Sequence, residues 1–171
     1  MHPRSWQSPD HPLRDVLNCG PVYDDWVVEA LKYLPKDVQA EVQRTVSFYS
    51  TASRDGCRIG RAICERREII LLSERILPNV ASEVDDPHVR YFIFIVLHEV
   101  VHAIKKHRPP SDLSSQDNDA QESEADALAF SWFNSYIEAL KNPHLKPLTQ
   151  EEIDEAKKKN LRLMERAKYG G

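Results

Sequence analysis

The chain has 171 residues, of which 41% are hydrophobic and 29% are charged, and its formal net charge is −4 at pH 7. This length suits one domain with a single hydrophobic core, and the acidic balance excludes a chain-wide attraction to nucleic acid or anionic membranes. The cysteines Cys19, Cys57 and Cys64 are odd in number and irregularly spaced, which argues against a disulfide framework and leaves no CxxC metal pair. We therefore expect reduced thiols and a reducing compartment.

Residues 1–21 are rich in proline and show little periodicity, so they predict an extended N-terminal arm. They hold no apolar segment typical of a signal peptide. The most apolar run, residues 91–97, is far shorter than the roughly 20 residues of a membrane span. We therefore expect a cytoplasmic protein, with one domain over residues 22–141. Residues 142–171 are expected to form a linker and a helix that packs on that domain.

Two helices are predicted after the arm. Residues 23–34 begin with acidic side chains and end before Pro35, as helices often do. Residues 36–49 predict a second helix, because apolar side chains recur there at helical spacing, namely Val38, Val42, Val46 and Tyr49.

The next segment predicts strands. Residues 58–64 alternate polar and apolar side chains, and residues 68–73 form a β-rich run. Because Arg66 and Arg67 between them can turn the chain, we expect an antiparallel hairpin. A short helix is expected over residues 74–81.

The central helix is predicted over residues 88–107. Asp86 and Pro87 are typical of a helix start, and Pro109 stops the helix. The helix is apolar on nearly all sides, so it should be buried in the core. Polar residues over 111–119 predict a mobile loop after it.

A second long helix is predicted over residues 120–141, and its apolar stripe comprises Ala125, Leu128, Ala129, Trp132, Phe133, Tyr136, Ile137 and Leu140. Prolines separate it from a last helix, whose start at Thr149 and Glu152 has the pattern of a capping box. The chain therefore predicts an α+β fold that is mostly helical, with a small β-sheet beside the central helix.

The central helix carries His98, Glu99 and His102, an HExxH motif. The helical period places the two imidazoles on one face, one turn apart, so both can bind one zinc ion, and Glu99 can reach a water on the metal. Composition alone predicts roughly 0.02 such motifs in a chain of this kind. The alternative is a hydrogen-bonded pair of core histidines. Zinc is favoured because buried histidine and glutamate are costly without a partner.

A catalytic zinc needs a third protein ligand from another element. Glu122 lies on the apolar stripe of the helix over 120–141, which must pack on the central helix, so we expect Glu122 to be that ligand. Asp126, one turn later, should accept a hydrogen bond from the outer nitrogen of a zinc histidine. Glu124 and His107 remain rival ligands, although Glu124 also suits a plain helix N-terminus and His107 a solvent-facing helix end.

At these residues the chain resembles the gluzincin metallopeptidases, whose signature is HExxH followed by ExxxD; here these are His98 to His102 and Glu122 to Asp126. Residues 122–129 resemble most closely the corresponding segment of the ImmA/IrrE family, with Leu128 in place of the usual phenylalanine. The resemblance covers residues 68–133. It implies a zincin-like domain in which His98, His102 and Glu122 bind Zn²⁺.

The resemblance also implies that Glu99 is a general base and that an edge strand above the zinc pairs with the backbone of the substrate. Residues 68–73, or their partner in the hairpin, are the candidates for that strand. The function expected is a zinc metallopeptidase that hydrolyses protein or peptide substrates. Tyr136, His107 and His144 are candidates to assist the reaction, and the sequence does not choose among them.

Two other functions stay open. The chain can be a regulatory zinc-binding protein with little proteolysis, linked to a stress response or a repressor, or the zinc can be structural, with four protein ligands. A basic side of the last helix offers a contact to nucleic acid, but a solvated face is favoured in an acidic chain; its residues are Lys157, Lys158, Lys159, Arg162 and Arg166.

Overall fold

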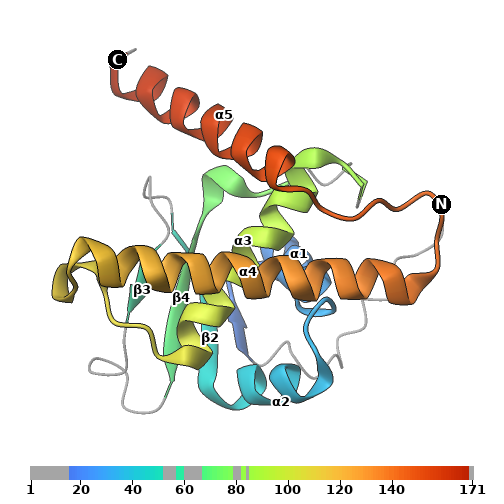
Figure 1. Cartoon of the computed structure of the whole chain (residues 1–171), viewed down its shortest axis with the longest axis horizontal. Helices are drawn as coiled ribbons and strands as arrows, with labels where there is room; N and C mark the ends of the chain where they lie inside the picture. Colours follow the sequence, from blue (N-terminus) through green and yellow to red (C-terminus); the bar gives the residue numbers. More distant parts are fainter. Residues whose placement is uncertain (1–15, 52–56, 60–66, 79–81, 84, 170–171) are drawn as a thin grey trace.

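The computed structural model describes residues 16–51, 57–59, 67–78, 82–83 and 85–169. The expected mostly helical α+β fold is confirmed (Figure 1). The helices are α1 (Pro21–Leu31), α2 (Lys36–Thr45), α3 (Pro87–Lys105), α4 (Ser115–Leu140) and α5 (Gln150–Tyr169), with short 3₁₀ turns η2 (Glu74–Ile76) and η3 (Pro110–Asp112).

The sheet has the strand order β1-β2-β4-β3, and its strands are β1 (Leu17–Asn18), β2 (Val46–Thr51), β3 (Cys57–Ile59) and β4 (Glu68–Ser73). The strands β1, β2 and β4 are parallel, and β3 pairs antiparallel with β4, Ile59 opposite Ile69. The antiparallel pairing is the one expected of a hairpin, although residues 60–66 of the predicted strand and turn lie outside the described residues. The strand β4 lies between β2 and β3, so it is not an edge of the sheet.

The helix predicted over residues 36–49 is confirmed to Thr45 and is wrong over residues 46–49, because α2 ends at Thr45 and Val46 opens β2. The backbone of Val46 is extended, and the side chains of Val46 and Phe48 are fully buried. The apolar spacing suits a helix as well as a strand here. Pairing with β4 along the whole of β2 decides for the strand, since those hydrogen bonds satisfy the backbone of a buried segment.

The segment predicted as an arm contributes to the sheet. Leu17 and Asn18 of β1 pair in parallel with Phe48 and Tyr49 of β2, and Leu17 is buried. Residues 1–15 of the predicted arm lie outside the described residues. Gly20, with φ of 97°, turns the chain out of β1 and into α1.

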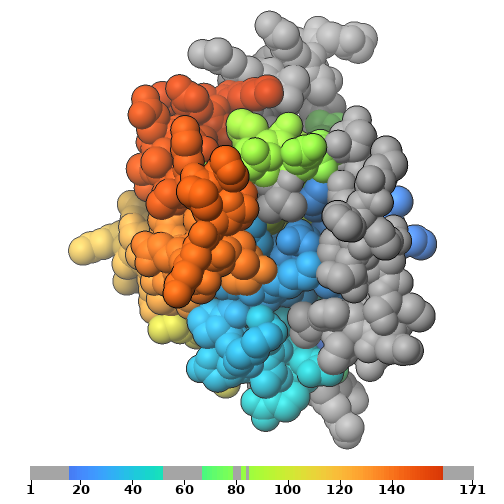
Figure 2. All heavy atoms as spheres, turned by 90° about the vertical axis from the view of Figure 1, so that its right-hand side faces the viewer, coloured from blue at the N-terminus to red at the C-terminus, as the bar shows by residue number. Residues whose placement is uncertain are grey.

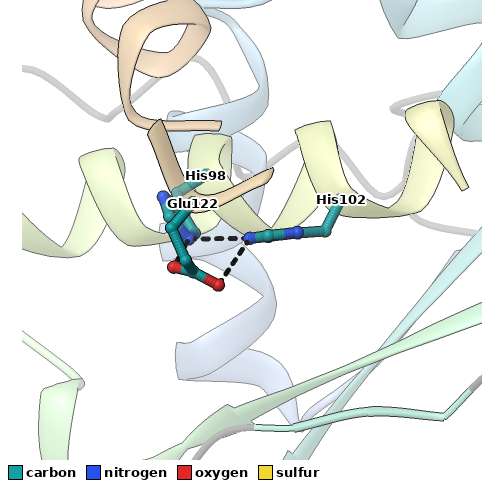
Figure 3. Close-up of side chains that lie close together, drawn as sticks. All are labelled: His98, His102 and Glu122. Atoms are coloured by element: carbon teal, nitrogen blue, oxygen red, sulfur yellow. Dashed lines mark hydrogen bonds and ion pairs between the residues drawn. The ribbon is translucent and has the colours of Figure 1, made fainter. Parts of the chain in front are cut away.

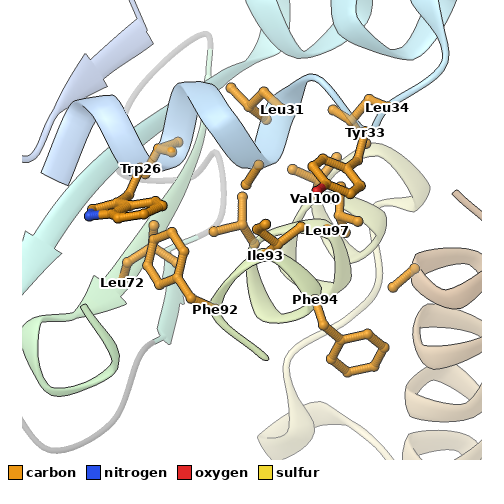
Figure 4. Close-up of a cluster of buried hydrophobic side chains, with 14 of the residues drawn as sticks. Trp26, Leu31, Tyr33, Leu34, Leu72, Phe92, Ile93, Phe94, Leu97 and Val100 are labelled. Carbon is orange, nitrogen blue, oxygen red and sulfur yellow. The ribbon is translucent and has the colours of Figure 1, made fainter. Parts of the chain in front are cut away.

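Helix α3 forms the centre of the core. It packs against α1, α4, α5 and β4. Figure 4 shows Trp26 and Leu31 of α1 facing the side of α3 that carries Ile93, while Phe94 points the other way. There the ring of Phe94 lies 5.0 Å from that of Phe130 of α4. Packing on several sides explains why α3 is apolar almost all round its axis.

The start of α3 follows the predicted signals, whereas its end does not. The carboxylate of Asp86 accepts a hydrogen bond of 2.7 Å from the backbone N–H of His88, and Pro87 occupies the first turn. The helix ends at Lys105, before the predicted position, because Lys106 takes the left-handed conformation with φ of 56°. This turn directs the chain at His107 back toward the end of α3.

Helix α4 begins at Ser115, so the loop predicted over residues 111–119 is wrong in its second part. The hydroxyl of Ser114 accepts a hydrogen bond of 3.1 Å from the backbone N–H of Asp117 and caps the helix. The polar residues that suggested a loop are instead the exposed first turns of a helix. The predicted short helix over residues 74–81 is reduced to η2, and residues 79–81 lie outside the described residues.

Helix α5 begins with the predicted capping box. The backbone N–H of Glu152 donates to the hydroxyl of Thr149 at 3.2 Å, and that of Thr149 donates to the carboxylate of Glu152 at 3.1 Å. Buried Arg90 of α3 binds the same carboxylate through two nitrogens, each at 3.1 Å, and also the carbonyls of Lys146 and Pro147. Figure 2 shows the linker and the start of α5, in orange and red, beside the start of α3 in lime green. Within the described part of the chain, no helix has both the length and the apolarity to cross a bilayer.

Candidate metal centre

Helices α3 and α4 bring three potential metal ligands together. His98 and His102 lie one turn apart on α3, with their Nε2 atoms 2.9 Å from each other. Helix α4 crosses α3 and presents Glu122, whose carboxylate points between the two rings in Figure 3. The Glu122 oxygens lie 3.4 Å from Nε2 of His98 and 3.6 Å from Nε2 of His102.

These three separations can be compared with those of a real coordination sphere. Two ligand atoms of a tetrahedral zinc, each 2.0–2.1 Å from the ion, lie about 3.3 Å apart. The observed distances between the ligand atoms are 2.9, 3.4 and 3.6 Å, on both sides of that value. The donors are two imidazole nitrogens and a carboxylate oxygen, a set that suits zinc. His98, His102 and Glu122 can therefore hold a metal ion.

The outer nitrogen of His98 has a carboxylate partner. Nδ1 of His98 lies 2.8 Å from Oδ1 of Asp126, one turn along α4 from Glu122. The second oxygen of Asp126 lies 3.2 Å from Nζ of Lys157 in α5, and that ammonium lies 5.9 Å above the ring of Phe94. Of the basic residues predicted on the last helix, Lys157 therefore contacts α3 and α4, whereas Lys158 is exposed to solvent.

The outer nitrogen of His102 has a different partner, His107. Nδ1 of His107 lies 2.8 Å from Nδ1 of His102, and Nε2 of His107 lies 3.2 Å from Oε2 of Glu124. The expectation of a solvent-facing His107 is wrong, because its exposed fraction is 7%. Glu124 lies beside His107 and forms an ion pair of 2.8 Å with Lys105. Of the candidates for the third ligand, Glu122 is the one that groups with the two motif histidines.

The three imidazoles and two carboxylates form one chain of contacts, in the order Asp126, His98, His102, His107 and Glu124. Each of its four contacts needs one hydrogen, because two nitrogen lone pairs at this distance repel. Three neutral imidazoles supply only three hydrogens, so the metal-free chain carries one imidazolium. The two end carboxylates can only accept, so Nδ1 of His98 donates to Asp126 and Nε2 of His107 donates to Glu124, and the two contacts between imidazoles share the other two hydrogens.

The pKa values agree with this hydrogen count. Burial would lower the pKa of His98, but its hydrogen bonds to Asp126 and Glu122 outweigh burial and raise it from 6.5 to about 9. The hydrogen bond with His98 lowers the pKa of Glu122. Burial alone would raise the pKa of Asp126, but the interaction with His98 outweighs it and lowers that pKa too. A bound cation would take the place of the hydrogen between Nε2 of His98 and Nε2 of His102.

The other residues that the sequence suggested for the reaction lie beside the three potential ligands or far from them. Glu99 is half-buried on α3, next to His98, and its charge helps to raise the pKa of that histidine. Tyr136 packs against Tyr33, with ring centroids 4.2 Å apart and the rings tilted by 38°. It lies about four helical turns from Glu122 along α4, or roughly 21 Å. His144 is exposed in the turn after α4, where its backbone N–H binds Asn142.

His107 is the member of this group that the motif did not reveal. Its position depends on the left-handed backbone of Lys106, a conformation that lysine seldom takes and that no neighbouring glycine announces. The return of the chain is fixed by a hydrogen bond of 3.0 Å from the backbone N–H of His107 to the carbonyl of His102. The one signal of His107 in the sequence is that a third histidine follows shortly after the motif.

Comparison of this chain with protein-family models, curated proteins and solved structures finds no match. What the chain itself presents is a group of two histidines and a glutamate, His98, His102 and Glu122, which two helices arrange so that it can hold a metal ion.

Proposed function

We propose that this chain is a zinc-dependent peptidase in which His98, His102 and Glu122 hold the ion. One observation carries the proposal: Nε2 of both motif histidines and the carboxylate of Glu122 converge at separations that suit a tetrahedral ion. Three protein ligands leave a fourth position for water or substrate, which is typical of catalytic zinc rather than structural zinc. The resemblance of the HExxH and ExxxD segments to gluzincins supports the same function.

The proposed reaction assigns a role to each residue of the group. When bound, zinc lowers the pKa of water and polarises the scissile carbonyl. Glu99 removes the proton from the attacking water and returns it to the leaving amine. Asp126 holds His98 in the orientation that leaves its Nε2 toward the ion, because the Nδ1–H of the ring donates to the carboxylate.

The sheet suggests where an extended substrate binds. The strand β4, one of the two predicted candidates, has neighbours on both sides, so its backbone is already paired. The strand β3, at the end of the sheet order, is the edge next to β4. We assign substrate binding to β3, where a peptide would add as a further strand.

Metal content and hydrolysis test this function together. The purified full chain should contain one zinc ion, hydrolyse an unfolded substrate such as casein, lose the activity to a chelator and regain it with zinc. Glu122→Ala should lose zinc and activity while folding normally, because the side chain is 47% exposed. Glu138→Ala, at an exposed glutamate of the same helix, is the matched control.

The possible results separate the candidate functions. Zinc that is retained by Glu122→Ala contradicts the ligand assignment. A wild-type protein that binds zinc through Glu122 and cleaves neither casein nor a mixed peptide library contradicts the peptidase, and leaves a regulatory zinc-binding protein as the function.

A further inference from the structure

His102 also has a partner on the side of its ring that faces away from His98 and Glu122. This contact does not involve the other two metal ligands. The left-handed turn at Lys106 folds His107 back on the helix end, so that its Nδ1 lies 2.8 Å from Nδ1 of His102. The other nitrogen of His107 lies 3.2 Å from Glu124 of α4, and the carboxylate of Glu124 also binds Lys105 at 2.8 Å. The two rings meet nearly edge to face, at an interplanar angle of 75°.

The direction of these hydrogen bonds is set by Glu124. A carboxylate only accepts, so Nε2 of His107 donates to Glu124, and Nδ1 of a His107 ring with one hydrogen is left as an acceptor. His102 must then carry its hydrogen on Nδ1, which leaves the lone pair on Nε2. That lone pair is the one that points toward His98 and Glu122. With the hydrogens reversed, Nε2 of His102 would carry hydrogen and could not bind a cation.

Lys105 and the burial of His107 reinforce this arrangement. The ammonium of Lys105 lies 2.8 Å from Glu124, so Lys105 and His107 both hold this carboxylate in place. His107 is 7% exposed, and hydrogen bonds that water cannot replace are stronger and hold the rings in place.

We propose that Glu124, acting through His107, selects the tautomer and the orientation in which His102 binds the metal. Both are positioning residues: Glu124 is not a ligand, and His107 contacts the metal-ligating ring only at its far nitrogen. The proposal rests on the proposed metal site, and it extends that site by two residues. The two histidine ligands are then oriented differently, His98 by a carboxylate directly and His102 by a carboxylate through a second imidazole.

Zinc affinity of the full chain, measured by competition with a chromophoric chelator, tests the proposal. His107→Leu removes the acceptor and should weaken zinc binding about 10- to 100-fold, the usual effect of losing a partner of a metal-bound histidine. His107→Asn restores an acceptor oxygen near the place of Nδ1, so its affinity should be closer to that of the wild type than to that of His107→Leu. Glu124→Ala should fall between wild type and His107→Leu.

A nitrogen NMR spectrum of the zinc-free protein gives a second measurement, one that a merely structural role would not change. His102 should show a single tautomer, with hydrogen on Nδ1, in the wild type. The Glu124→Ala variant should show a mixture of both tautomers. Glu124 is exposed, so this variant is expected to fold even if His107→Leu does not. Glu138→Ala again serves as the control on the same helix.

Each result is decisive. Wild-type affinity in His107→Leu and Glu124→Ala, or an unchanged His102 tautomer in Glu124→Ala, overturns the positioning role and leaves the metal site standing. A wild-type chain that binds no zinc overturns the metal site, and the positioning role with it.

Discussion

Oδ1 of Asp126 lies 2.8 Å from Nδ1 of His98, while the other nitrogen of the same ring faces His102 and Glu122. The ring of His98 is therefore held by a carboxylate at Nδ1 and presents Nε2 to the candidate metal position. Asp126 is itself held by Lys157 of α5, so three helices contribute to the orientation of one ligand.

We expect Asp126→Asn to fold and to bind zinc about 10- to 100-fold more weakly, because an amide orients the His98 ring less well than a carboxylate. Chelator competition measures the affinity. Asp119→Asn, at an exposed aspartate of the same helix, should bind zinc as the wild type does. Equal affinities for both variants would show that the contact between Asp126 and His98 does not support the site.

Glu99→Gln should retain zinc and lose hydrolysis. Glutamine is nearly the same size as glutamate but cannot accept the proton, and a general base contributes about 100- to 10,000-fold to a rate. Casein hydrolysis and metal content are measured on the same preparation. Full activity of the variant would exclude Glu99 as the base, whereas loss of zinc would mean that the substitution disturbs the ligands instead.

The stability of the zinc-free protein should depend on the protonation of His98. Its pKa is about 9 in the folded chain and near 6.5 when unfolded, so the fold favours the charged ring. This contribution to the free energy of unfolding is complete below pH 6.5 and is lost as the pH rises through 9.

Thermal unfolding with a chelator present should therefore occur at a lower temperature at about pH 10 than at about pH 6. Other groups also titrate in this range, so the informative quantity is the comparison with His98→Gln, which should show a smaller drop. An equal drop in both proteins would mean that the pKa of His98 is not raised by folding.

Arg90→Met should destabilise the protein by about 3 kcal/mol, because it removes a buried cation, leaves two backbone carbonyls without their donor and takes the cationic partner from the carboxylate of Glu152. Denaturant unfolding measures the loss. Arg75→Met, at an exposed arginine, should change stability little. Because Arg90 fixes the start of α5, zinc affinity in Arg90→Met should also fall, through the looser contact between Lys157 and Asp126. An unchanged free energy of unfolding would contradict the role of Arg90 in holding the start of α5 against α3.

The sequence determined the features that depend on neighbouring residues. The helical period alone places His98 and His102 on one face. Asp86 with Pro87, and Thr149 with Glu152, mark helix starts because capping involves residues within one turn of each other. Glu122 and Asp126 could be selected as a pair for the same reason, since they lie one turn apart on a stripe that must face the core.

Only the tertiary structure decided the features that depend on distant partners. Val46 begins a strand because β4 pairs with it, and Leu17 joins the sheet because β2 lies beside it. His107 reaches His102 only because the chain reverses at Lys106, and α4 supplies Glu124 on the far side. Local periodicity carries no information on such pairings. They are set by which surfaces meet when the whole chain buries its apolar side chains and satisfies its backbone hydrogen bonds.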